Sequence, residues 1–113
     1  MNTLNFYPYY RSLLEDRTKT TTLRLPSKQR FQLGEKVMLT VGWPDEKHFE
    51  ALHPAKIEMV YEKKLVELTE EDLAGESPDC LAVNAVPYVL GAIYRKILKS
   101  EDSVLVIKFK HSD

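Results

Sequence analysis

The sequence predicts an α+β fold in which a curved sheet or a small barrel carries helices at one side. Three observations lead to this expectation. Segments rich in β-branched residues dominate the middle of the chain, helical patterns lie near its start and in its last third, and the elements follow the order β-α-β-β-β-α-α-β. The chain has 113 residues, a length typical of one domain, so we expect residues 1–113 to form a single domain.

The first third of the chain is expected to hold a strand, a helix and a second strand. Residues 2–6 favour a short strand, and Pro8 suits the first turn of a helix that ends near Asp16 or Arg17. Residues 18–25 include four threonines, whose β-branched side chains favour a strand. The expected helix therefore lies between two strands.

The middle of the chain predicts two further strands joined by a loop. Residues 36–41 form an apolar segment that a Gly-Trp-Pro turn ends. The polar segment 45–54 is expected to be a loop. Apolar and charged residues alternate within 55–68, which indicates a strand with one buried face.

The last third predicts two helices and a final strand. Thr69 is expected to be the N-cap of a short helix, with Asp72 three residues on in the position of a capping box. Residues 80–98 favour a second helix that its internal proline and glycine should kink or split. Residues 103–110, SVLVIKFK, are the strongest strand prediction in the chain.

Charge is distributed unevenly along the chain, although the net charge is only −1. Residues 11–36 hold seven basic and three acidic residues, whereas residues 58–79 hold eight acidic residues and two lysines. One interpretation is that these are two solvated faces. The other is that the basic segment meets an anionic ligand while one carboxylate of the acidic segment reaches across to it.

Composition excludes several classes of protein. A single Cys80 rules out an internal disulfide framework and fits a reducing compartment. His48, His53 and His111 have no cysteine or paired carboxylate at ligand spacing, so we expect no metal and no other cofactor. No apolar run approaches the roughly 20 residues of a membrane span, and the N-terminus lacks the pattern of a secretion signal. We therefore expect a cytoplasmic protein.

Residues 13–24, LLEDRTKTTTLR, resemble the signature of ASCH domains, a branch of the PUA-like superfamily. The family pattern is G-x-K-x-x-T-x-R after the first helix. Lys19, Thr22 and Arg24 fall on its Lys, Thr and Arg. Arg17 replaces its Gly, at a position where glycine usually serves a positive φ or a close approach.

Three further segments agree with this resemblance. Residues 31–37, 68–76 and 104–109 are similar, in that order, to the family's second-strand entry, its short acidic helix and its final strand. The resemblance implies a PUA-like fold, which is a small β-barrel or strongly curved sheet with flanking helices. It also implies a cleft between barrel and helices, proposed in the family to bind RNA or modified nucleosides.

The resemblance also implies candidate catalytic residues. Small single-domain members are similar to a bacterial amidohydrolase that removes the acetyl group of N4-acetylcytidine. Its Lys, Thr and Glu triad maps onto Lys19, Thr22 and Glu76. The glutamate falls in a variable segment, so three neighbouring carboxylates remain competitors: Glu70, Glu71 and Asp72.

Amide hydrolysis needs a nucleophile, a proton shuttle and a donor for the developing oxyanion. Thr22 is the candidate nucleophile and Lys19 the candidate base, with Glu76 orienting Lys19 or shuttling the proton. Arg24 shares a strand face with Thr22 and could donate to a carbonyl or a phosphate. Because Lys19 and Thr22 are three residues apart, a flat strand would point them to opposite faces. The scheme requires Lys19 to lie in the turn before the strand, or a bulge between them.

The second hypothesis is an RNA-binding module without catalysis. In it, Lys19, Arg24, Lys28 and Arg30 contact phosphates, and Arg17 is a further candidate ligand contact. The net charge of −1 favours a small ligand over a long phosphate backbone, so the expected partner is a nucleoside, with RNA as the alternative.

An aromatic group accompanies the basic segment. Its members are Tyr7, Tyr9, Tyr10 and Trp43. These rings could stack on a base, but packing in the core or at the rim of a cleft is the commoner role.

Overall fold

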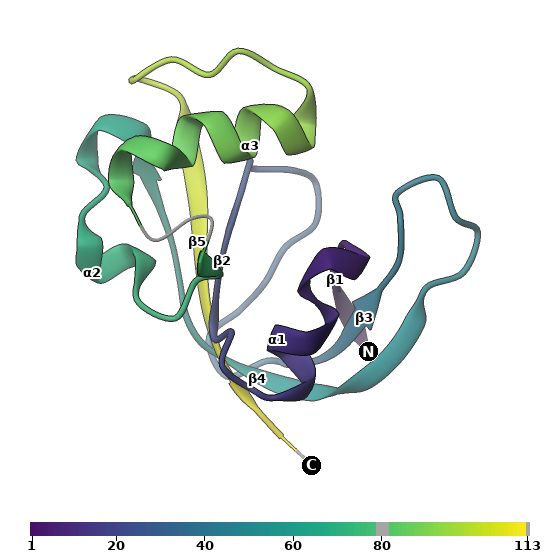
Figure 1. Ribbon diagram of the computed structural model, residues 1–113. Helices are drawn as coiled ribbons and strands as arrows, with labels where there is room; N and C mark the ends of the chain where they lie inside the picture. The colour runs from purple at the N-terminus through teal and green to yellow at the C-terminus, as the bar shows by residue number, and fades with distance from the viewer. Residues whose placement is uncertain (79–81, 113) are drawn as a thin grey trace.

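The computed structural model describes residues 1–78 and 82–112, which form one mixed five-stranded sheet with flanking helices. The strands are β1 (Asn2–Phe6), β2 (Thr21–Arg24), β3 (Lys36–Val41), β4 (Glu50–Lys64) and β5 (Ser103–His111). Their order in the sheet is β1-β3-β4-β5-β2. β1 pairs with β3 in parallel and the other neighbours are antiparallel. The sheet is strongly curved, as a half-barrel (Figure 1).

The helices within residues 1–78 and 82–112 are short and flank the sheet. They are η1 (Pro8–Tyr10), α1 (Arg11–Glu15), η2 (Leu65–Glu67), α2 (Glu70–Leu73), η4 (Val83–Ala85) and α3 (Val86–Tyr94). Figure 1 shows α3 across one end of the curved sheet and α1 nearer the other end, with β2 and β5 running between them. Helices of this length are held by packing on the sheet rather than by their own propensity.

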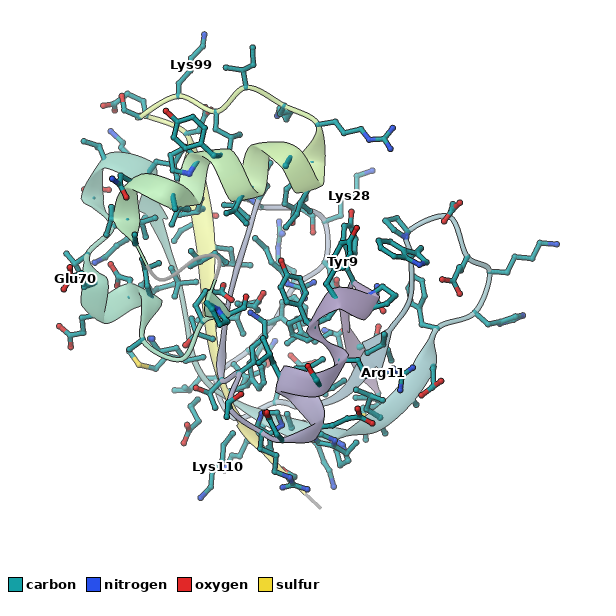
Figure 2. The ribbon with its side chains drawn as sticks, in the orientation of Figure 1. Tyr9, Arg11, Lys28, Glu70, Lys99 and Lys110 are labelled. Atoms are coloured by element: carbon teal, nitrogen blue, oxygen red, sulfur yellow. The ribbon has the colours of Figure 1, made fainter. Side chains whose placement is uncertain are left out.

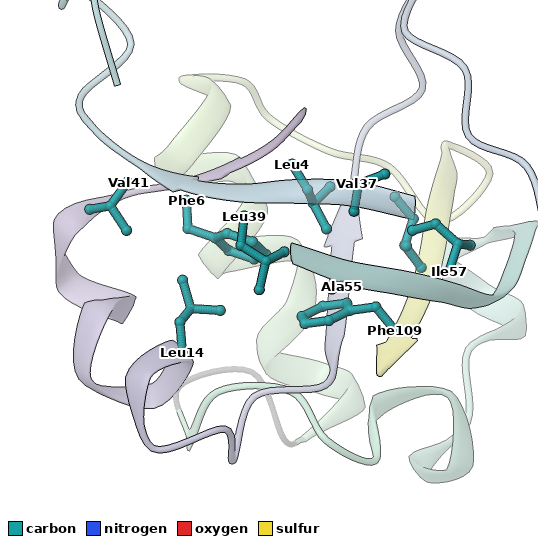
Figure 3. Packing of buried hydrophobic residues seen from close by; sticks show 10 residues of the cluster. Leu4, Phe6, Leu14, Val37, Leu39, Val41, Ala55, Ile57 and Phe109 are labelled. Carbon is teal, nitrogen blue, oxygen red and sulfur yellow. The ribbon is translucent and has the colours of Figure 1, made fainter. Parts of the chain in front are cut away.

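Two apolar clusters fix the helices to the sheet. The first lies on β1, β3, β4 and β5 and is closed by Leu14 of α1 (Figure 3). The second joins Leu23 of β2 and Val106 of β5 to Leu73 of α2 and Leu90 of α3. Since residues alternate across a strand, the burial of Leu23 in the second cluster places Thr22 and Arg24 on the opposite face of β2.

The predicted class and element order are confirmed, and β1 and β3 have the predicted bounds. The predicted capping box is also present, because Asp72 accepts a hydrogen bond from the Thr69 backbone N–H at 2.9 Å. The final strand extends one residue beyond the prediction, to His111.

The expected loop over 45–54 is wrong from residue 50 onward, because β4 begins at Glu50 and runs through Pro54. The Pro54 carbonyl accepts a hydrogen bond from the Ser112 N–H at 2.9 Å. A residue's nitrogen and carbonyl point to the same side of an antiparallel ladder, so the Pro54 nitrogen faces the very end of β5. The missing N–H of Pro54 therefore disrupts the β4–β5 ladder least, because the ladder ends there.

The helix expected over 80–98 is shorter than predicted, and its described part is divided next to Pro87, into η4 and α3. Pro87 lies in the first turn of α3, where its missing N–H has no intrahelical partner to lose. The helix ends at Tyr94 because Arg95 adopts a left-handed backbone with φ of +54°. Cys80 lies outside the described residues. The strand expected over 18–25 is limited to β2, and residues 18–20 precede it.

Candidate functional site

A cavity of about 230 Å³ opens between β2, the end of β1 and α3. Its polar wall is formed by Asn5, Lys19, Thr22, Arg24, Glu76 and Ser77. Its apolar wall includes Phe6 of the first cluster and Leu90 and Ile93 of α3. The cavity therefore presents a group of polar side chains to an otherwise apolar space, the usual character of a small-ligand site.

An ion pair between Lys19 and Glu76 lies in the polar wall. The two side chains are only 3% and 5% exposed. The Lys19 ammonium also donates to Ser77 Oγ at 3.2 Å and lies 5.1 Å from the centre of the Tyr10 ring. These contacts satisfy a charge that would otherwise be costly to bury.

The Glu76 carboxylate is held by its neighbours in a fixed orientation. Its Oε2 atom accepts a hydrogen bond from the Leu23 backbone N–H at 3.0 Å. Its Oε1 atom accepts from the Ser77 N–H at 2.7 Å and from the Ser77 hydroxyl at 2.9 Å. The bond to Leu23 ties the carboxylate directly to β2, on which Thr22 and Arg24 lie. Ser77 was missed by sequence reasoning, because a lone serine after a glutamate carries no recognisable pattern.

Gly75 brings Glu76 close to β2. It has a φ of +88°, and its carbonyl accepts hydrogen bonds from the Thr20 and Thr21 N–H groups at 2.8 and 3.0 Å. A Cβ atom at this position would lie 2.2 Å from Thr20 Oγ1. Only glycine allows both the backbone conformation and this approach.

Lys108 of β5 fastens the end of α2 next to Gly75. Its ammonium donates to the carbonyls of Glu71, Asp72 and Ala74 at 3.1 to 3.3 Å. These carbonyls lie at the C-terminal end of α2, where a cation is favourable. The segment that carries Glu76 is thereby anchored to the sheet from a second side.

Lys19 lies in the irregular segment before β2 and not on the strand itself. The alternation of a flat strand, which would point Lys19 and Thr22 to opposite faces, therefore does not apply, and both side chains line the cavity. The Lys19 backbone N–H donates to the Leu13 carbonyl at 3.1 Å. Its own carbonyl lies 2.7 Å from His111 Nε2, and His111 Nδ1 lies 2.7 Å from His53 Nε2. Sequence reasoning missed this histidine pair, because its members are 58 residues apart.

Arg24 and Thr22 form the other half of the polar wall. The Arg24 Nε–H donates to Thr22 Oγ1 at 3.3 Å, and its Nη2 donates to the Asn5 carbonyl. The guanidinium lies 4.9 Å from the centre of the Phe6 ring. Burial lowers the pKa of Arg24 from its usual value. Arginine remains charged in proteins, so a fixed cation faces the threonine hydroxyl.

The competing carboxylates lie elsewhere. Glu70 and Glu71 are exposed on α2, and Glu70 points away from the molecule in Figure 2. Asp72 is buried but accepts hydrogen bonds from the Tyr61 hydroxyl at 2.6 Å and the Lys63 ammonium at 2.9 Å. Of the four candidate carboxylates, Glu70, Glu71, Asp72 and Glu76, Glu76 is thus the one that lines the cavity.

Three of the predicted ligand contacts do not line the cavity. Arg17 is exposed and has a φ of +65°, so it adopts the conformation for which the family pattern has glycine. Lys28 and Arg30 are exposed in the segment between β2 and β3, and Arg30 donates to the Ser27 carbonyl at 2.6 Å. The basic segment is therefore divided between the cavity and the surface.

Within residues 1–78 and 82–112, no group of three or more His, Cys, Asp or Glu side chains is arranged to hold a metal ion. The helices of this described part are too short or too polar to cross a membrane.

Comparison with known proteins shows similarity at the level of the fold. No family model and no curated protein matches the sequence. The structure is similar to an ASCH domain from Lactobacillus crispatus JV V101, with a TM-score of 0.65 and 12% identity, covering 88% of this chain and 68% of that one. It is also similar to protein EF3133 from Enterococcus faecalis V583, described with the family model DUF984. There the TM-score is 0.67 and the identity 12%, over 100% of this chain and 82% of that one. The chain thus has an ASCH-like fold, which confirms the PUA-like α+β class.

Proposed function

We propose that this chain is an amidohydrolase that removes an acyl group from N4-acylated cytidine-like nucleosides, using Lys19, Thr22 and Glu76. The observation that carries the proposal is the buried Lys19–Glu76 ion pair in a cavity that Thr22 also lines. The Lys, Thr and Arg positions of the ASCH signature and the ASCH-like fold support it.

Thr22 is the proposed nucleophile. A threonine hydroxyl attacks an amide only when its proton is removed as the bond forms. The Arg24 guanidinium donates to Thr22 Oγ1, and a cationic donor on that oxygen favours loss of the hydroxyl proton. The donor also leaves the hydroxyl hydrogen available to a base.

Lys19 and Glu76 are the proposed proton shuttle. Lys19 first passes a proton to the Glu76 carboxylate, and the resulting amine accepts the proton of Thr22 as Oγ attacks the acyl carbon. The carbon–nitrogen bond then breaks, and Lys19 returns that proton to the departing N4 amine. The acyl group is left on Thr22 Oγ. Water next attacks this ester and gives a proton to Lys19, and the bond between the acyl carbon and Thr22 Oγ breaks as a carboxylic acid is released. Lys19 passes that proton to Thr22 Oγ, which restores the hydroxyl, and Glu76 returns its proton to Lys19.

The size of the cavity supports a small substrate. Its volume of about 230 Å³ lies below the roughly 300–1,000 Å³ of sites for drug-sized ligands. A single pyrimidine with a short acyl group suits this space. Aromatic and aliphatic side chains, among them Phe6 and Ile93, would contact its flat faces.

The geometry favours the hydrolase over the RNA-binding module. That module uses Lys19, Arg24, Lys28 and Arg30 as phosphate contacts. Lys19 is already ion-paired with Glu76, Arg24 is half-buried and packed on Phe6, and the other two side chains lie outside the cavity. Extended phosphate binding instead needs several unopposed, accessible cations.

A panel of N4-acylated cytidines tests the proposal. Chromatography should show conversion of N4-acetylcytidine to cytidine and acetate by the wild-type protein, and the Thr22→Ala variant should lose it while keeping its circular dichroism spectrum. Thr3→Val, on the exposed side of β1, is the matched control and should turn over at the wild-type rate. Failure of the wild-type protein to hydrolyse any member of the panel would contradict the proposal.

A further inference from the structure

Three exposed aromatic side chains lie together beside the candidate site. Tyr9 of η1, Trp43 after β3 and Tyr88 of α3 line a hollow of about 490 Å³. Their exposed fractions are 73%, 38% and 79%. We call Tyr9, Trp43 and Tyr88 the aromatic shelf. Large aromatic rings left exposed in a group usually mark a binding surface rather than incomplete packing.

Contacts with two tyrosine rings hold the Trp43 ring of the shelf. Trp43 meets Tyr9 edge-on, with ring centres 5.1 Å apart and planes at 86°. It also meets Tyr7, beneath the shelf, at 5.4 Å and 49°. Because both contacts join Trp43 to the segment that carries Tyr7 and Tyr9, they hold the Trp43 ring in place before any ligand arrives. A pre-positioned ring loses little conformational entropy when a flat ligand stacks on it.

The shelf adjoins the cavity that Lys19 and Thr22 line. Four residues line both spaces: Tyr7, Tyr10, Val89 and Ile93. Among them, Tyr7 forms a shared wall, and its hydroxyl donates to the Ile93 carbonyl at 3.4 Å. A ligand that fills the cavity and continues past Tyr7 therefore reaches the shelf next.

Charge near the shelf suits a single phosphate. Arg95, which ends α3, lines an adjoining hollow together with Trp43 and Tyr7. Asp45 lines the same hollow, so the local balance is one cation against one anion. One bridging phosphodiester could contact Arg95, whereas a long phosphate backbone would find few cations here.

We infer that the aromatic shelf is a subsite for a second nucleobase, and that the preferred ligand is a short single-stranded oligonucleotide. Its N4-acylated cytosine enters the cavity and the neighbouring base stacks on the shelf. The inference rests on the proposed function, because that function supplies the occupant of the cavity. Any base can stack on aromatic side chains. The shelf should therefore favour ligands that carry a second base, whichever base it is.

Trp43 fluorescence tests the inference directly, since Trp43 is the only tryptophan in the sequence. The probes are N4-acetylcytidine and a dinucleotide that joins N4-acetylcytidine to adenosine through one phosphodiester. The dinucleotide should quench Trp43 saturably and bind at least about tenfold more tightly than the nucleoside. With one phosphate neutralised, log affinity should fall against log salt with a slope of about −0.7.

Variants separate the shelf from the chemistry. Tyr9→Ala and Tyr88→Ala should each weaken dinucleotide binding about tenfold. Leu33→Ala, an equally exposed apolar residue that lines none of the hollows described above, should bind like the wild-type protein. Thr22→Val should lose hydrolysis but still bind the dinucleotide. The binding assay therefore measures stacking on the shelf independently of the hydrolysis reaction.

Three results would overturn the inference. Equal affinity for nucleoside and dinucleotide would mean that the second base makes no favourable contact with the shelf. Unchanged affinity in both tyrosine variants would mean the same. Saturable quenching by an apolar helical peptide, with none by the dinucleotide, would assign the shelf to a protein partner instead.

Discussion

The Lys19 ammonium and the Glu76 carboxylate form a buried ion pair that joins two segments 57 residues apart in sequence. One segment leads into β2 and the other follows α2. A buried ion pair adds little to stability compared with apolar residues of the same volume, but removal of one partner leaves an uncompensated charge. The pair therefore contributes little net stability, although loss of either partner alone should be costly.

Neutralising one partner of this pair should be more damaging than neutralising both. Glu76→Gln leaves the Lys19 ammonium buried without a counter-charge and should lower the free energy of unfolding by about 3–5 kcal/mol. The double variant Lys19→Met with Glu76→Gln should recover most of that loss and remain inactive. Urea unfolding followed by circular dichroism measures both values. A double variant that is less stable than Glu76→Gln alone would show that the charges are not coupled in this way.

Gly75→Ala should disturb the site more than the same change at Gly34. Both glycines have a positive φ, +88° and +82°, so alanine should cost about 1 kcal/mol at either position. Only at Gly75 does the added Cβ meet another atom, Thr20 Oγ1. We expect Gly75→Ala to lose additional stability and to lose turnover, because it moves Glu76 away from β2. Gly34→Ala should keep its turnover, and parallel losses of activity in the two variants would contradict this account.

Arg17→Gly should stabilise the protein relative to Arg17→Ala. Arg17 has a φ of +65°, a conformation that costs a residue with a Cβ roughly 1–2 kcal/mol. Both substitutions remove the same side chain, so their difference isolates the backbone. Thermal unfolding should give Arg17→Gly the higher midpoint, by a few degrees. Equal midpoints would mean that residue 17 relaxes out of the left-handed region in solution.

Asp72 should make stability depend on acid pH. Burial opposes ionisation of Asp72, but hydrogen bonds from Tyr61, Lys63 and Thr69 outweigh it and hold the pKa of the carboxyl well below its usual range. An unfolded aspartate has a pKa of about 3.9. The stability that Asp72 contributes is therefore fully present above that value and is lost as pH falls towards the depressed pKa of the folded state.

The Asp72→Asn variant measures this contribution. The difference in unfolding free energy between wild type and variant should be largest at neutral pH and should shrink below about pH 4. Glu70→Gln, which changes an exposed carboxylate on the same helix, is the control and should show little dependence. If the difference between wild type and Asp72→Asn stays constant down to about pH 2, the assigned role of the carboxylate is contradicted.

The sequence predicted elements well where a local pattern decides the structure. Residues 36–41 match β3 because an apolar, β-branched segment between turn residues has no helical alternative. Thr69 and Asp72 form the predicted capping box because their interaction spans only three residues. Local reasoning failed at Pro54, which is tolerated in β4 because of where β5 ends, a fact of tertiary structure.

The candidate site was predicted in part for the same reason. Lys19, Thr22 and Arg24 lie within six residues and could be grouped from one motif. Glu76 came from the resemblance alone, and only the folded chain separates it from its neighbour Asp72. Tyr9 and Trp43 of the aromatic shelf were grouped from the sequence, whereas Tyr88 and the histidine pair depend on contacts between distant segments, which no local pattern encodes.

The most direct test of the central claim compares two substitutions at Thr22. Initial rates of cytidine release from N4-acetylcytidine should be measured by chromatography for wild type, Thr22→Ser and Thr22→Val. Serine keeps a hydroxyl on the same backbone position, whereas valine keeps the shape and removes it. The account predicts that Thr22→Ser retains measurable turnover and that Thr22→Val falls at least about a hundredfold, to the limit of detection. Turnover by Thr22→Val at the wild-type rate would contradict it.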